Sequence, residues 1–155
     1  MTEYSPAIIY IGGKLRDDQL DELASAAEDD GAGLDWGEDS PSSDEIRVRL
    51  QPGSQLYLMN DEAPHGELYT LENFCSQHNL SYRRRSEAYA EYDSEITGWE
   101  PGMDTIRHCL ANQNGQPVIT ISNLRRYLQA NTELHQVITE LTWFEPWELP
   151  PFEAV

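Results

Sequence analysis

The sequence predicts an α+β domain built around a single mixed or antiparallel sheet. Three features lead to this fold class. An apolar, β-branched run stands near the N-terminus, a helical repeat of apolar residues follows it, and short extended segments then recur along the chain. A chain of 155 residues can bury one hydrophobic core without disulfide or metal support. We therefore expect one domain over residues 1–155.

The first strand and the first helix are predicted from residues 7–30. The apolar run AIIYI at 7–11 predicts a buried strand, which Gly12 and Gly13 are expected to end. A helix is expected from Arg16, because apolar residues recur at spacings of three and four and the acidic residues fall on other faces. The apolar positions are Leu20, Leu23, Ala24 and Ala27. Gly31 and Gly33 should stop this helix.

A β-hairpin is the next prediction. Ile46, Val48 and Leu50 alternate with arginines, a Pro-Gly pair follows at 52–53, and QLYLMN at 55–60 continues the pattern. Alternation of this kind is typical of a half-buried strand, and Pro-Gly is typical of a turn. The sequence therefore predicts strands at 46–50 and 56–60.

The following segments complete a βαββαβ order over residues 1–84. Apolar residues at helical spacing predict a second helix over 68–78, and LSYRRR at 80–85 again has an extended pattern. This order resembles a ferredoxin-like sheet with its helices mainly on one face. Such an analogy of fold licenses no function.

The last part, residues 85–155, is expected to be an α-rich extension of the same domain. EITGW at 95–99 and PVITI at 117–121 are predicted strands, and residues 104–112 are a predicted short helix. One or two helices are expected over 122–141. The ending from 143 contains too much proline for regular structure.

Charge is the strongest functional signal in the sequence. The formal net charge is −18, and twelve acidic residues lie between Asp17 and Glu45 without one basic residue. Such a field repels nucleic acid and anionic lipid, so we expect neither direct nucleic-acid binding nor a membrane role. It attracts basic proteins, which are the expected partners.

Two acidic stretches are the predicted partner-binding residues. The first supplies Asp29, Asp30, Asp35, Trp36, Glu38, Asp39, Asp44 and Glu45. The second interleaves carboxylates with aromatic side chains and supplies Glu87, Tyr89, Glu91, Tyr92, Asp93, Glu95 and Trp99. Aromatic residues ringed by carboxylates suit the recognition of Arg and Lys. The alternative for the second stretch is an edge strand with aromatics inward and charge in water.

The expected function is non-catalytic inhibition of a nucleic-acid-binding or defence protein by imitation of DNA. This expectation rests on charge and size alone, by analogy with the acidic anti-restriction and anti-CRISPR proteins of phages and plasmids. The alternatives are an acidic adaptor or immunity-type protein, a salt-adapted protein whose charge is only solvated, and a small enzyme with unassigned carboxylates. The low cysteine count favours a cytoplasmic location.

Other motifs point only weakly to chemistry, and no metal or cofactor is expected. Cys75-x-x-His78 and His108-Cys109 provide four zinc-type ligands, but the second pair lacks the usual gap between ligands. A cysteine nucleophile would need electropositive surroundings. Gly12-Gly13-Lys14 lacks the rest of a phosphate-loop motif.

The aromatic tail has two readings. Trp143, Phe144, Trp147 and Phe152 either fold back over the core or form a homodimer or partner contact. Coverage of the core is favoured, because large exposed apolar patches are rare on monomers.

Overall fold

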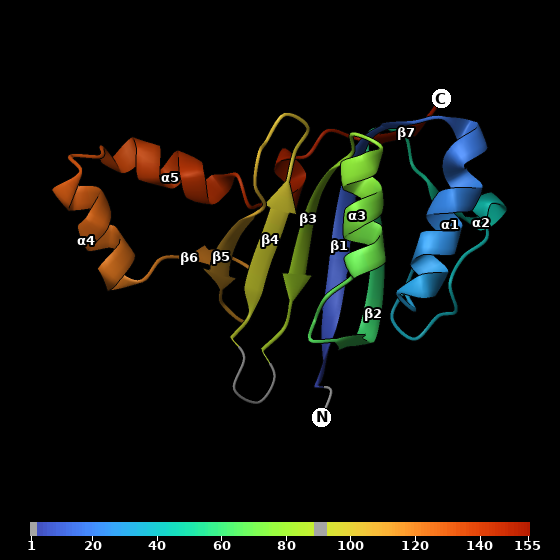
Figure 1. The fold of residues 1–155 in the computed structure, drawn as a ribbon, viewed down its shortest axis with the longest axis horizontal. Coiled ribbons are helices and arrows are strands. Elements are labelled where there is room, and N and C mark those ends of the chain that lie inside the picture. The colour runs from blue at the N-terminus through green and yellow to red at the C-terminus, as the bar shows by residue number, and fades with distance from the viewer. Residues whose placement is uncertain (1–2, 89–92) are drawn as a thin grey trace.

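A computed structural model describes residues 3–88 and 93–155 of the protein. Its centre is one seven-stranded sheet (Figure 1). Six strands lie in the order β2-β1-β3-β4-β5-β6 with antiparallel neighbours, and β7 runs parallel to the end of β1. The strands are β1 (Tyr4–Leu15), β2 (Leu56–Pro64), β3 (Ser81–Ser86), β4 (Glu95–Trp99), β5 (Arg107–Ala111), β6 (Pro117–Val118) and β7 (Phe152–Ala154). The predicted α+β class with a single sheet is confirmed.

Five α-helices within residues 3–88 and 93–155 accompany the sheet. They are α1 (Leu20–Asp29), α2 (Ser43–Arg49), α3 (Tyr69–Gln77), α4 (Ile121–Gln129) and α5 (Leu134–Thr142). Figure 1 shows α1 and α2 beside β2 at one end of the molecule, and α4 and α5 beyond β5 and β6 at the other. No helix in the described ranges is both long and apolar enough to cross a bilayer.

The main core lies between the sheet and the pair α1 and α3. Ile9 and Ile11 of β1 and Leu58 of β2 are fully buried and belong to the same cluster as the apolar faces of both helices. The predicted stripe of α1 is confirmed, because Leu20, Leu23 and Ala27 are inaccessible to water and Ala24 is partly buried against them. This packing fixes α1 and leaves its acidic side in solvent.

The predicted hairpin at 46–60 is wrong in its first strand, which is the helix α2. Ser42 and Glu45 form a capping box, in which the Ser42 hydroxyl accepts a hydrogen bond from the Glu45 amide at 3.2 Å. Ile46 is buried and Leu50, one helical turn later, is partly buried against the core, whereas Val48 is 84% exposed. A half-buried strand would bury Val48 on the same face as Ile46. The burial of Ile46 and Leu50, four residues apart, instead matches the repeat of a helix.

The ferredoxin-like start is not confirmed. The observed order up to β3 is β1-α1-α2-β2-α3-β3, and β1 lies between β2 and β3, antiparallel to both. The second helix, the extended segment at 80–85 and the strand at 95–99 are confirmed as α3, β3 and β4.

Several boundaries in the rest of the chain also differ from the prediction. Gly12 and Gly13 do not end β1, because they pair with Ser81 of β3 and Phe152 of β7. Residues 107–111 form β5 instead of a helix, since their hydrogen bonds to β4 override the helical pattern. The strand at 117–121 is reduced to β6, because Thr120 caps α4 with its side chain. The two helices over 122–141 are confirmed.

The first part of the tail, with Trp143 and Phe144, covers the other face of the sheet, whereas Phe152 belongs to the main core. Phe144 and Phe152 are buried, which confirms coverage for these two residues, whereas Trp147 is 65% exposed. Phe152–Ala154 forms β7, so the expectation of an irregular tail is wrong there. Trp143 packs against Gly98 of β4, where an added Cβ would approach the indole ring to 3.0 Å. Glycine at this position therefore lets the tail reach the sheet.

Candidate functional site

The exposed carboxylates of α1 and of the segment that follows it form the candidate site. This segment returns along α1, because the Ser40 hydroxyl donates to the Ala27 carbonyl at 3.2 Å and Gly33 pairs with Met59 at the outer edge of β2. We call the exposed carboxylates of the two segments the acidic face. Its members are Asp21, Glu22, Glu28, Asp29, Asp35 and Asp39.

Two arginines neutralise part of the acidic stretch that appears uncompensated in the sequence. Arg47 contacts Asp17 at 2.9 Å and Asp44 at 2.7 Å, and Arg49 contacts Glu38 at 3.0 Å. The hydrogen bonds from Arg47 lower the pKa of Asp17. Both arginines follow the acidic window directly in the sequence, and the turns of α2 bring them back to it. Glu38 and Asp44 therefore serve in ion pairs within the protein.

Asp30 and Glu45, also predicted as binding residues, have structural roles. The Asp30 carboxylate accepts hydrogen bonds from the amides of Thr70 at 3.2 Å and Leu71 at 2.7 Å, in the first turn of α3. Burial raises the pKa of Asp30, against the opposing effect of these two hydrogen bonds. Asp30 thus ties the end of α1 to the start of α3, and Glu45 closes the capping box of α2.

Trp36 stands at the tip of a turn within the acidic face. The Glu38 amide donates a hydrogen bond to the Asp35 carbonyl at 3.2 Å, and the Asp35 carboxylate accepts a hydrogen bond from the Trp36 amide at 2.8 Å. Gly37 has a φ of 75°, which glycine adopts without steric penalty. The turn leaves Trp36 42% exposed between carboxylates. A rigid indole in such a setting is a suitable anchor for a protein contact.

The second acidic stretch is not part of the acidic face. Tyr89, Glu91 and Tyr92 lie outside the described residues, and Glu87 and Asp93 are exposed on either side of them. β4 lies between β3 and β5, so it is not the edge strand that was considered as an alternative. β1 and β3 separate β4 from the edge strand β2, where the first stretch lies.

Glu95 and Trp99 of the second stretch are engaged inside the protein. Glu95 contacts Arg84 at 3.5 Å, and the Trp99 indole donates to the Met103 carbonyl at 3.1 Å. Arg83 contacts Glu100 at 2.8 Å. Arg83 and Arg84 therefore each pair with carboxylates within the protein.

The cysteines lack the surroundings of a nucleophile. Cys75 is fully buried, and burial raises the pKa of its thiol far above the usual range. Burial also raises the pKa of Cys109, to about 11. Both thiols are protonated at neutral pH and therefore react slowly. Within residues 3–88 and 93–155, no three His, Cys, Asp or Glu side chains are grouped to hold a metal ion.

The glycines before Lys14 do not form a phosphate loop. Gly12 and Gly13 lie inside β1, and the Gly13 amide donates to the Pro151 carbonyl at 3.0 Å. This amide is therefore already used within the protein.

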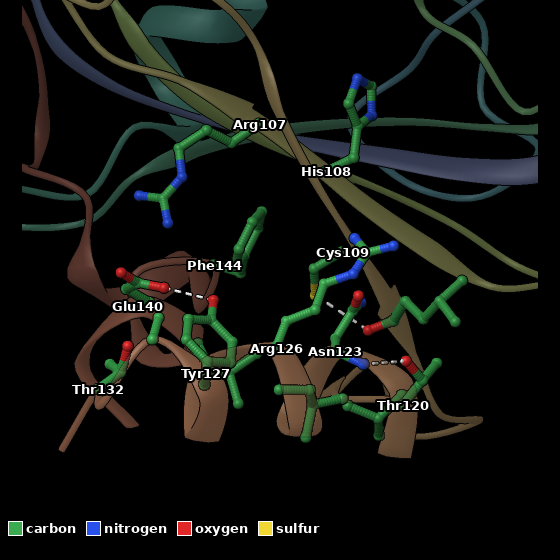
Figure 2. Close-up of a pocket in the computed structure, with 15 residues that line it drawn as sticks. Arg107, His108, Cys109, Thr120, Asn123, Arg126, Tyr127, Thr132, Glu140 and Phe144 are labelled. Carbon is green, nitrogen blue, oxygen red and sulfur yellow. Dashed lines mark hydrogen bonds between the residues drawn. The ribbon is translucent and has the colours of Figure 1, made fainter. Parts of the chain in front are cut away.

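A cleft that the sequence did not reveal lies between the end of the sheet and the helical pair α4 and α5 (Figure 2). Its volume is about 600 Å³, and its lining includes Arg107, Cys109, Arg126, Tyr127 and Glu140. The prediction missed it because residues 104–112 were expected to form a helix, whereas β5 forms one wall.

Several side chains of this cleft are engaged with other residues of the protein. The Arg107 guanidinium lies 4.4 Å from the centre of the Trp143 ring and 5.3 Å from that of Phe144. The Tyr127 hydroxyl donates to Glu140, and this hydrogen bond raises the pKa of Tyr127. With a protonated thiol and a tyrosine of raised pKa, the cleft offers no activated nucleophile.

Searches for similar proteins add nothing to this geometry, because no family model, no curated protein and no solved structure matches the chain.

Proposed function

We propose that the protein binds a basic partner protein through the acidic face and has no catalytic role in that interaction. The partner we infer is a nucleic-acid-binding protein, of the kind involved in defence against foreign DNA, whose basic groove accepts the acidic face in place of nucleic acid. The observation that carries the proposal is the row of exposed carboxylates on α1, extended by Asp35 and Asp39 and accompanied by Trp36.

The average density of charge along α1, with one pair of carboxylates near each end of the helix, supports mimicry of nucleic acid. The helix has 10 residues and exposes Asp21, Glu22, Glu28 and Asp29. Ten residues span about 15 Å, so these four carboxylates give about one charge per 4 Å of axis. A DNA strand carries about one phosphate per 3.4 Å of axis. The two charge densities are similar enough for the same basic groove.

The surroundings of the acidic face favour binding because they hold it in place. Ion pairs from Arg47 to Asp17 and from Arg49 to Glu38 fasten α2 and the 31–42 segment beside α1. A partner would therefore lose little affinity to ordering of this surface. Unpaired carboxylates would speed association by long-range attraction, and the Trp36 indole would slow dissociation by direct contact.

The test must separate the effect of charge on the acidic face from the effect of net charge. We suggest a triple variant with Asp29→Asn, Asp35→Asn and Asp39→Asn, in which three exposed carboxylates become neutral side chains of similar shape. A matched control carries Asp104→Asn, Glu148→Gln and Glu153→Gln, which removes the same charge from exposed positions outside the acidic face.

Each protein would be used to capture partners from cell lysate, followed by salt elution and competition with duplex DNA. We expect wild type and control to retain basic nucleic-acid-binding proteins that duplex DNA displaces, and the triple variant to lose them at lower salt. Equal retention by all three proteins would contradict the proposal. In that case the carboxylates only solvate the surface, as in a salt-adapted or adaptor protein.

A further inference from the structure

The helical pair α4 and α5 lies at the end of the molecule opposite α1 and α2 (Figure 1) and carries several exposed apolar side chains. Five large apolar side chains in these two helices are exposed by 43–75% of their area. We call them the hairpin face. They are Ile121, Leu124, Leu128, Leu134 and Ile138.

These exposed apolar residues recur at helical spacing, which is typical of a helix face that packs against another element. Ile121, Leu124 and Leu128 recur at intervals of three and four along α4, and Leu134 and Ile138 recur at an interval of four along α5. Between the helices lies a groove of about 400 Å³ lined mainly by apolar side chains. Val137 is the only buried residue in α4 and α5. So little burial leaves most of the apolar surface of both helices available to a further partner.

The charges around the hairpin face are complementary to themselves. Arg125 of α4 lines the groove, and the capping residue Glu133 precedes Leu134 at the start of α5, whereas Arg126 and Glu140 line the cleft on the sheet side. Residues 118–142 thus sum to zero in a protein of net charge −18. In a two-fold symmetric pair, α4 of one copy can face α5 of the other, so that a positive charge on α4 meets a negative charge at α5.

We propose that the hairpin face is the contact between two copies of this chain. The four helices of two copies would form an antiparallel bundle, with the five apolar side chains of each copy inside and Arg125 on α4 of one copy near Glu133 of the other. This arrangement joins the copies through a neutral surface and keeps their acidic bodies apart, which minimises repulsion between two molecules of charge −18. It also leaves the acidic face of each copy free.

The contact differs from the aromatic tail that the sequence suggested for a homodimer. Phe144 and Phe152 are buried within one chain and are not available to a second. Trp143 lies between two arginines, since the guanidinium carbons of Arg83 and Arg107 are 3.4 Å and 4.4 Å from its ring centre.

Two single substitutions test the contact without disturbing the fold of one chain. Leu128 and Leu134 are 75% and 70% exposed and line the same groove from opposite helices. The variants Leu128→Glu and Leu134→Lys each place an unpaired charge in the proposed interface. The matched control is Val48→Glu, at an exposed position on α2. Molar mass would be measured by light scattering and sedimentation over a range of concentrations, and helix content by circular dichroism.

We expect a dimer for wild type and for Val48→Glu, and monomers of unchanged helix content for each interface variant alone. Mixing Leu128→Glu with Leu134→Lys should restore a mixed dimer, because glutamate on α4 of one copy then faces lysine on α5 of the other. A monomeric wild type would overturn the proposal and leave the hairpin face to a different protein. A dimer that survives both interface substitutions would overturn it as well. Neither result bears on the acidic face, which the triple asparagine variant tests separately.

Discussion

Arg84 donates a hydrogen bond from Nε to Oε1 of Glu72 at 3.1 Å and so joins β3 to α3 inside the protein. The side chains are only 4% and 11% exposed. Arg84 also donates to the Gly66 carbonyl at 2.7 Å and to the Thr97 hydroxyl at 3.2 Å. Arg84, one of the few basic residues of this acidic protein, therefore stabilises its interior.

Loss of Arg84 should strongly destabilise the fold. Arg84→Met leaves Glu72 and the Gly66 carbonyl without their buried partner, and breaking a buried pair in this way costs about 3–5 kcal/mol. Arg85→Met is the matched control, because Arg85 is the next residue, is half-buried and has no carboxylate partner among the described residues. We expect its effect to stay below about 1 kcal/mol. Urea denaturation measures both, and equal losses would show that the pair is unimportant.

Stability should increase when the pH falls from neutrality towards the ordinary carboxylate pKa values. Burial raises the pKa of Glu72, despite the nearby Arg84, and that of Asp30 above their ordinary values of 4.5 and 3.8. The folded protein therefore binds more protons than the unfolded chain between those values and the raised ones, and the free energy of unfolding rises as pH falls through this window. Protonation also relieves repulsion among the surface carboxylates.

The variant Glu72→Gln isolates one part of this effect. Glutamine cannot titrate, so the gain in unfolding free energy as the pH falls from neutrality towards 4.5, the ordinary pKa of a glutamate, should be smaller than in wild type. Thermal or urea unfolding at several pH values would measure it. A wild-type stability that falls steadily over the same interval would refute the assignment, because paired carboxylates such as Asp17, whose pKa is lowered, would then dominate.

The helix α2 should depend on its cap. Ser42→Ala removes the acceptor for the Glu45 amide and should lower the free energy of unfolding by about 1 kcal/mol. Ser43→Ala, one residue into the helix, should have an effect within about 0.5 kcal/mol. If residues 46–50 were a strand, as their alternation suggests, the two substitutions would be indistinguishable.

Alternation and helical spacing explain which elements could be predicted from the sequence. The stripe Leu20, Leu23 and Ala27 allows only a helix, and the apolar run at 7–11 is too short for a helix of its own, so both predictions are confirmed. Ile46, Val48 and Leu50 fit a strand by alternation and a helix by the interval of four. The Ser42–Glu45 capping box, which is visible in the sequence, and the burial of Ile46, which is not, favour the helix.

Contacts between distant segments explain what could not be predicted. β5 and β7 form because β4 and β1 present open hydrogen-bonding edges to them, and no local pattern reports this. The acidic stretch was visible in the sequence, but its partial neutralisation by Arg47 and Arg49 depends on how α2 packs beside α1. The hairpin face was invisible because apolar residues at helical spacing normally indicate a core.

Trp36 should control how long a partner stays bound. Its indole is 42% exposed at the tip of the Asp35–Glu38 turn, so Trp36→Ala removes contact area without opening the core and should change the unfolding free energy by less than about 0.5 kcal/mol. A central aromatic anchor contributes about 2 kcal/mol or more to binding, which corresponds to an increase of about 30-fold in the dissociation rate. The association rate should hardly change, because Trp36 carries no charge.

The triple asparagine variant should behave in the opposite way, with slower association and a smaller dependence on salt. Surface plasmon resonance with the isolated partner separates the two rates, and Trp147→Ala, at an exposed tryptophan far along the chain, is the control. If Trp36→Ala and Trp147→Ala dissociate at the wild-type rate, the turn is not an anchor and attraction between charges alone would have to hold the partner.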